Sequence, residues 1–159
     1  MNNLTTIPPE KATLVDIRTD ARRFPRLHTY RREEAIAQMN MIVMMAYQYR
    51  GQHADAQTIM QLSTSLIDIL NEDEYQIGTK YLSFEEIKRI VRKAALGQTK
   101  EMYGISVSSL FQALADYCKG EGKMASQQAS EIAAKQREFK NAIIAPMLQG
   151  YSEELAKRK

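Results

Sequence analysis

The sequence lacks tryptophan, has a single cysteine, Cys118, and contains only two histidines, His28 and His53. One cysteine cannot close a disulfide within the chain, and an isolated thiol in the apolar pattern of a helix is typical of a small buried hydrophobe. These three side chains are also too few soft ligands for a zinc or iron site. We therefore expect no metal site and no cofactor.

Glycine is scarce as well, because the 7 glycines are scattered and none belongs to a phosphate-binding loop. Neither histidine lies near a nucleophile elbow, so a catalytic triad is not expected. Glu85 and Glu86 are adjacent, and adjacent positions on a helix diverge by about 100 degrees, which does not suit paired acid and base catalysis. The sequence predicts a protein that is not an enzyme, with no catalytic residues and no small-molecule substrate.

Long apolar runs are also missing. The richest stretch, residues 41–47, is far shorter than the roughly 18 to 20 residues that cross a bilayer, and the first ten residues do not resemble a secretory signal. We expect a cytoplasmic protein without a membrane partner. With 44% hydrophobic and 26% charged residues in 159, the composition is that of one folded globular domain.

Apolar residues recur every three or four positions, which predicts helices over residues 33–50, 55–70, 83–96, 106–119 and 123–145. Ser83 and Glu86 form a capping box at the start of the third helix, and Pro146 is expected to kink or end the last. The predicted fold class is all-α, a compact bundle of about five helices with an extended basic N-terminal arm. Met41, Met44 and Met45 widen the apolar surface of the first helix, which is typical of a central or a partner-facing helix.

Charge divides the chain into three parts. Residues 1–32 carry 7 basic and 3 acidic side chains, residues 33–122 carry 8 and 12, and residues 123–159 carry 7 and 4. We interpret these parts as a basic N-terminal arm, partly ordered with a short helix near residues 12–22, a helical core domain, and a C-terminal helix with a basic tail. Two basic ends thus flank an acidic middle.

Basic side chains supply the candidate binding residues. Arginines suit phosphates and carboxylates alike, and basic residues at helix positions 88, 89, 92 and 93 lie together on one half of the helix surface. The alternative is a merely solvated basic segment. A helix-turn-helix is not favoured, because about eight to ten residues connect the helices at 83–96 and 106–119. The candidates are Arg22, Arg23, Arg26, Arg31 and Arg32 in the arm, and Lys88, Arg89, Arg92 and Lys93 on the helix that begins at Ser83.

Residues 81–117 carry a pattern of Leu82, Glu86-Ile87, Gly97, Tyr103-Gly104-Ile105-Ser106-Val107, Leu114 and Tyr117. This stretch resembles small helical proteins of Bacteroides-type phages and mobile elements, some of which are similar to replication or helicase-loading factors. The chain has Lys100 where that pattern has glycine and Ala113 where it has tryptophan. The resemblance implies a replication setting and no catalytic residues.

Two functional hypotheses follow. The first is a non-enzymatic accessory protein of a phage or mobile element, replication-associated, that binds DNA or a replication protein through its basic surfaces. The second is a helical protein-protein interaction or oligomerisation module without nucleic-acid contact. In the second, the methionine-rich helix at 33–50 and the alanine- and glutamine-rich helix at 123–145 would associate with another protein or form a homo-oligomer.

Overall fold

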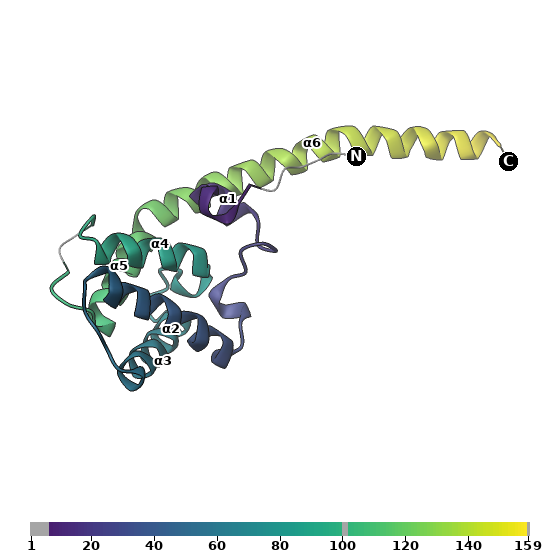
Figure 1. The fold of residues 1–159 in the computed structure, drawn as a ribbon. Coiled ribbons are helices and arrows are strands. Elements are labelled where there is room, and N and C mark those ends of the chain that lie inside the picture. The colour runs from purple at the N-terminus through teal and green to yellow at the C-terminus, as the bar shows by residue number, and fades with distance from the viewer. Residues whose placement is uncertain (1–6, 100–101, 159) are drawn as a thin grey trace.

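The structure is a computed structural model that describes residues 7–99 and 102–158. Within these ranges every regular element is helical, and the single β-bridge, between Arg26 and Ser83, is isolated. The prediction of an all-α bundle of about five helices is therefore confirmed for the described residues (Figure 1). The α-helices are α1 (Leu14–Thr19), α2 (Arg32–Tyr49), α3 (Ala56–Glu72), α4 (Phe84–Ala95), α5 (Val107–Lys119) and α6 (Glu121–Lys157). The 3-10 helices are η1 (Pro9–Lys11), η2 (Leu27–Thr29) and η3 (Thr79–Tyr81).

The core lies between α2, α3, α4 and α5. Helix α2 packs on α3 and α4, and α5 packs on α3, α4 and α6. Each helix turns its apolar positions inward, so Met39, Leu66, Ile87, Leu110 and Leu114 have no exposed surface. The three- and four-residue spacing of the sequence thus defines one continuous core.

Side-chain caps explain where several helices begin. Ser83 accepts from the backbone N–H of Glu86, and the Glu86 side chain accepts from the backbone N–H of Ser83, so the predicted capping box is confirmed. Ser106 caps α5 in the same way with Ser109, and Asp55 caps α3 by accepting from Thr58. Each cap satisfies an amide that would otherwise lack a partner in the first turn.

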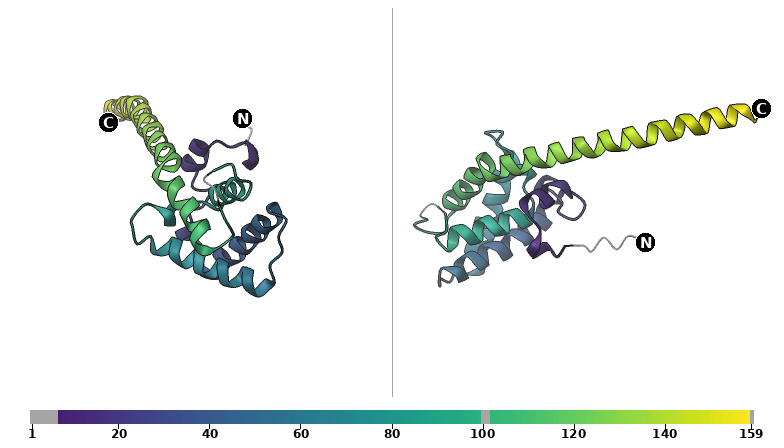
Figure 2. Two further views of the ribbon diagram at one scale, coloured as in Figure 1. Left: turned by 90° about the vertical axis from the view of Figure 1, so that its left-hand side faces the viewer. Right: turned by 90° about the horizontal axis from the view of Figure 1, so that it is seen from above.

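The basic N-terminal segment folds back on the bundle (Figure 2). Its short helix α1 packs against α6 and α4, and its own small cluster buries Ala12, Ile17 and Phe24. The backbone N–H of Leu27 donates to the carbonyl of Leu82 at 2.7 Å, which ties the segment to the start of α4. The short helix expected near residues 12–22 is present at Leu14–Thr19.

Helix α6 is longer than the sequence suggested. It begins at Glu121 and continues through Pro146 to Lys157, so the end that was one of the two alternatives expected at Pro146 does not occur. Proline removes one backbone donor but its fixed φ is close to the helical value, and here good helix formers surround it. Gly122, Ala125 and Ala129 bury one face against the bundle, and every residue from 134 to 158 is exposed. We call residues 134–158 the free arm and the other described residues the body (Figures 1 and 2).

Candidate functional site

A buried carboxylate joins the N-terminal segment to the bundle. Glu86, on α4, is fully buried. Its Oε1 accepts from Arg18 Nε at 2.5 Å and from the Tyr117 hydroxyl at 2.8 Å. Its Oε2 accepts from the backbone N–H of Ser83 at 2.8 Å and from the Ser83 hydroxyl at 3.0 Å. Two helices and the basic segment therefore meet at one side chain.

Arg26 completes this cluster. Its Nη1 lies 3.9 Å from Oε2 of Glu86, and its Nη2 donates to the backbone carbonyl of Arg18 at 2.7 Å. Burial lowers the pKa of Arg26, and the neighbouring Glu86 opposes that shift. The sequence placed Arg26 among the candidates for partner binding. Its partly buried place against Glu86 could not be read from the sequence, because the two residues are far apart in the chain.

Burial also governs the two titratable side chains of α5 beside this cluster. It raises the pKa of the Tyr117 hydroxyl, and the adjacent Glu86 carboxylate raises it further. Burial raises the pKa of the Cys118 thiol to about 12. Tyr117 therefore stays protonated as a hydrogen-bond donor, and Cys118 stays a thiol, which does not suit a nucleophile.

The other arginines of the N-terminal candidates divide into side chains with a partner among the described residues and side chains that are exposed. Arg32 donates from Nε and Nη2 to the two oxygens of Asp68, both at 2.9 Å. Arg23 donates to the backbone carbonyl of Ile7 and lies 5.2 Å from the ring centroid of Phe24. Arg22 and Arg31 are exposed. Much of the predicted basic surface is thus used inside the chain.

The basic stripe on α4 is divided in the same way. Arg89 donates to Glu85 at 3.2 Å and to the carbonyls of Ala12 at 2.6 Å and Pro9 at 2.8 Å, so it fastens the N-terminal segment. Lys88, Arg92 and Lys93 are exposed, with Arg92 5.7 Å from the ring centroid of Tyr49. Arg89 therefore ties the N-terminal segment to α4 without contacting its candidate arginines among the described residues, while three cations of α4 still face outward.

The free arm carries the largest exposed apolar side chains of its helix. Phe139, Met147 and Tyr151 are exposed by 67%, 69% and 66%. Residues 139, 143, 147, 151 and 155 follow one another at intervals of four and therefore form a ridge along one side of the helix. We call this set, with its neighbours, the apolar stripe. Its members are Phe139, Ile143, Ile144, Met147, Leu148, Tyr151 and Leu155.

The apolar stripe continues the face by which α6 packs on the body. At 100 degrees per residue, Ala125 and Ala129 lie in the same angular sector as Ile143 and Met147. In the sequence, the apolar positions of residues 123–145 look sparse and predict a poor core element. The extension of the helix beyond Pro146 aligns the later apolar residues with them.

Protein-family models, curated proteins and solved structures were all compared with this chain, and none matches it. Within residues 7–99 and 102–158, no helix combines the length and the apolar character needed to cross a membrane. In the same ranges, no three His, Cys, Asp or Glu side chains gather as ligands of a metal ion. The geometry of the free arm and of the basic side chains therefore carries the functional argument.

Proposed function

We propose that this chain is a protein-protein interaction module and that the free arm of α6 is its contact element. The observation that supports this proposal is the apolar stripe, which runs along the arm without any cover from the body. Exposed apolar patches of this size on a soluble domain are typical of interaction surfaces. A helix that offers apolar anchors at intervals of four presents the pattern used when one helix lies against another.

The area of the apolar stripe fits an interface. Its seven side chains are exposed by between 44% and 69%. Together they offer on the order of 700 Å², close to the roughly 800 Å² that each partner contributes to an interface of standard size. The stripe alone is therefore large enough for a stable contact.

A second copy of the chain is the partner that we propose first. In an antiparallel pair of free arms centred on Met147, Phe139 lies opposite Leu155 and Ile143 lies opposite Tyr151. The same register sets Lys140 opposite Glu154, so opposite charges meet beside the apolar residues. A twofold arrangement of this kind uses the same surface on both copies, as most homodimers do.

The test is the oligomeric state of the full chain, measured by sedimentation over a wide range of concentrations. We expect a dimer for the native chain and a monomer for Met147→Glu, because the substitution brings two carboxylates together at the centre of an apolar contact. Met41→Glu is the matched control, since Met41 is exposed by 62% but lies on α2. It should still form the dimer.

A native chain that stays monomeric at the highest concentration would remove self-association. If Met41→Glu dissociates the dimer and Met147→Glu leaves it intact, the interface lies on the methionine-rich face of α2 and not on α6. The first result would contradict a second copy as the partner, and the second would contradict the proposed role of the free arm.

Nucleic-acid binding is the second candidate, and the exposed cations of α4 favour it. Lys88, Arg92 and Lys93 face outward on one helix, and Arg22 and Arg31 are exposed on the N-terminal segment. In this version the chain is a replication-associated accessory protein of a phage or mobile element, the setting implied by the resemblance of residues 81–117. Phosphate contacts by these side chains would make the affinity for DNA depend steeply on salt.

Binding of a duplex oligonucleotide at several salt concentrations tests this candidate. Removing one cation that neutralises a phosphate should reduce the log-log slope by about 0.9, so Lys88→Gln with Lys93→Gln should flatten it by nearly two. Lys135→Gln, on the free arm, should leave the slope unchanged. Absence of binding at low salt, or a slope that the double variant does not change, would rule out this surface.

A further inference from the structure

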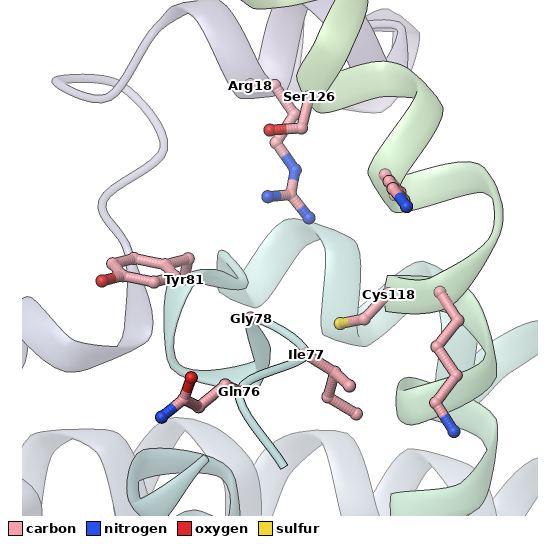
Figure 3. A pocket seen from close by; sticks show the side chains of 10 residues that line it. Arg18, Gln76, Ile77, Gly78, Tyr81, Cys118 and Ser126 are labelled. Atoms are coloured by element: carbon pink, nitrogen blue, oxygen red, sulfur yellow. The ribbon is translucent and has the colours of Figure 1, made fainter. Parts of the chain in front are cut away.

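Two adjoining hollows lie between α6, α1 and the loop that leads to η3, and Figure 3 shows the first of them. Their volumes are about 520 and 400 Å³, within the usual range for small-molecule sites. Arg18, Tyr81 and Ser126 line both hollows, so we treat the two as one anion hollow. In Figure 3 the guanidinium of Arg18 points into this space from α1.

The lining of the anion hollow is basic on one side. Among the described residues it contains five cationic side chains and no carboxylate. They come from the N-terminal segment, from the end of α5 and from α6, so folding gathers charges that are distant in the sequence. These side chains are Arg18, Arg26, Lys119, Lys123 and Arg137.

The two innermost arginines are held in place by contacts within the chain, and Arg18 points into the hollow. Arg18 uses Nε to bind Glu86, while the end of its guanidinium points toward the hollow in Figure 3. Arg26 uses Nη2 to bind the carbonyl of Arg18, and its Nη1 is buried without a hydrogen-bond acceptor within the described ranges. Their side chains are exposed by only 10% and 14%. Arg26 Nη1 lies 3.9 Å from Oε2 of Glu86, so its positive charge adds to that of Arg18 at the wall of the hollow.

Glu86 does not neutralise this pair. It carries one negative charge against two guanidinium groups, and its two oxygens already accept four hydrogen bonds. Net positive charge therefore remains at the wall of the hollow, partly screened from water. Guanidinium groups that are fixed in this way suit the oxygens of a phosphate.

The other side of the anion hollow is less polar. Ile77, Gly78 and the ring of Tyr81 line it, and the sulfur of Cys118 faces the same space in Figure 3. Tyr81 is exposed by 47%, and its ring also contacts His28 edge-on and the Lys80 ammonium, whose Nζ lies 5.3 Å from the ring centroid. A planar ring can pack against this tyrosine while an attached phosphate reaches the arginines.

We propose that the anion hollow binds a small phosphorylated molecule of nucleoside monophosphate size. Its phosphate lies against Arg18 and Arg26, Lys123 and Arg137 cover it from α6, and its less polar part lies beside Tyr81. The sequence predicted no small-molecule substrate, since these residues form no sequence motif. The site is separate from the apolar stripe, so it extends the proposed function and does not depend on it.

Calorimetric titration of the full chain tests this site at fixed ionic strength, with adenosine monophosphate, inorganic phosphate, adenosine and succinate as probes. We expect adenosine monophosphate to bind most tightly, phosphate more weakly, and adenosine and succinate weakest. Lys123→Gln and Arg137→Gln should each weaken adenosine monophosphate about tenfold, the effect of losing one charged hydrogen bond. Both residues are on α6 and exposed, so these changes should leave the fold intact.

Lys135→Gln is the matched control, because Lys135 is exposed on α6 and does not line the hollow. It should bind the probe as the native chain does. The proposal is overturned if neither phosphate probe binds, if succinate binds as tightly as phosphate, or if the double variant Lys123→Gln, Arg137→Gln binds unchanged. Sedimentation of Met147→Glu reads out the apolar stripe separately, so the two proposals can fail independently.

Discussion

The two ends of α6 share one helix but differ in what covers them. Near its start, Gly122, Ala125 and Ala129 are buried against the body. In the free arm, Phe139 and Tyr151 are exposed by about two-thirds. Small residues allow close approach of two backbones, whereas the large apolar residues extend beyond anything the body offers. One helix face therefore serves as a packing surface in the body and as an unoccupied surface in the arm.

The stability of the two parts should differ for the same reason. Packing holds the body together, while the arm depends on local helix propensity, since all of its residues are exposed. We expect amide hydrogen exchange in the arm of a dilute sample to be faster than in α3 or α4 by about a thousandfold or more. Mass spectrometry of peptides from the two regions measures this. Equal protection at low concentration would show that the arm is covered within one chain.

Glu86→Ala should have the next largest effect, a loss of stability of the body. It removes the acceptor of Arg18 and Tyr117 and leaves buried cations without compensation, so we expect a loss of about 3 to 5 kcal/mol in the free energy of unfolding. Urea denaturation measures this loss. Glu154→Ala, which removes a partner of Arg158 in the arm, should change stability by less than about 0.5 kcal/mol. Similar losses for the two variants would mean that Glu86 is not the junction that the structure describes.

Two glycines of α6 offer the same substitution in both environments. A Cβ on Gly122 would lie 2.9 Å from Cε1 and 3.0 Å from the backbone oxygen of Tyr117, so Gly122→Ala should destabilise the body by about 1 to 3 kcal/mol. A Cβ on Gly150 meets nothing within 4 Å. Gly150→Ala should therefore strengthen the helix of the arm by about 0.5 to 1 kcal/mol.

Urea denaturation measures the stability change caused by Gly122→Ala. Circular dichroism and hydrogen exchange of the arm measure the change caused by Gly150→Ala. We expect the first substitution to destabilise the protein and the second to stabilise the helix of the arm. A destabilising effect of Gly150→Ala would mean that the arm packs against something that needs glycine at this position.

The smallest expected change in the free energy of unfolding occurs at low pH, and we expect it only for a substitution in the body. The hydrogen bonds with Thr13 hold the pKa of Asp16 below its ordinary value of 3.8. Its contribution to stability is therefore fully present above that ordinary value and is lost as the pH falls through the lowered one. Because solvent reaches Asp16, the contribution should be roughly a few tenths of a kcal/mol. Asp16→Asn should flatten the acid limb of stability measured by urea denaturation, and Glu153→Gln, in the arm, should leave that limb unchanged.

Much of the bundle could be predicted because its signals are local. The start of α4 at Ser83 follows from two side chains three residues apart, and the inward faces follow from spacing. The burial of Cys118 was expected from the same pattern. The predicted end of α6 was wrong. A proline predicts the end of a helix, but α6 continues through Pro146 because good helix formers surround it.

The candidate site was less predictable because its contacts are distant. Arg89 binds carbonyls 77 and 80 residues away, and Arg18 binds a carboxylate 68 residues away. No periodicity or spacing carries such information. A count of basic residues identified the cationic segments, but not which side chains are used internally and which stay free.

By itself the sequence determined the helical class, the caps and the apolar faces, because these depend on residues three or four positions apart. Only the tertiary structure decided that the N-terminal arginines meet Glu86, that five cations surround one hollow, and that the apolar stripe of α6 lies beyond the body. The physical reason is one of range. Helix formation is settled by near neighbours, whereas burial and charge pairing depend on which distant segments fold together.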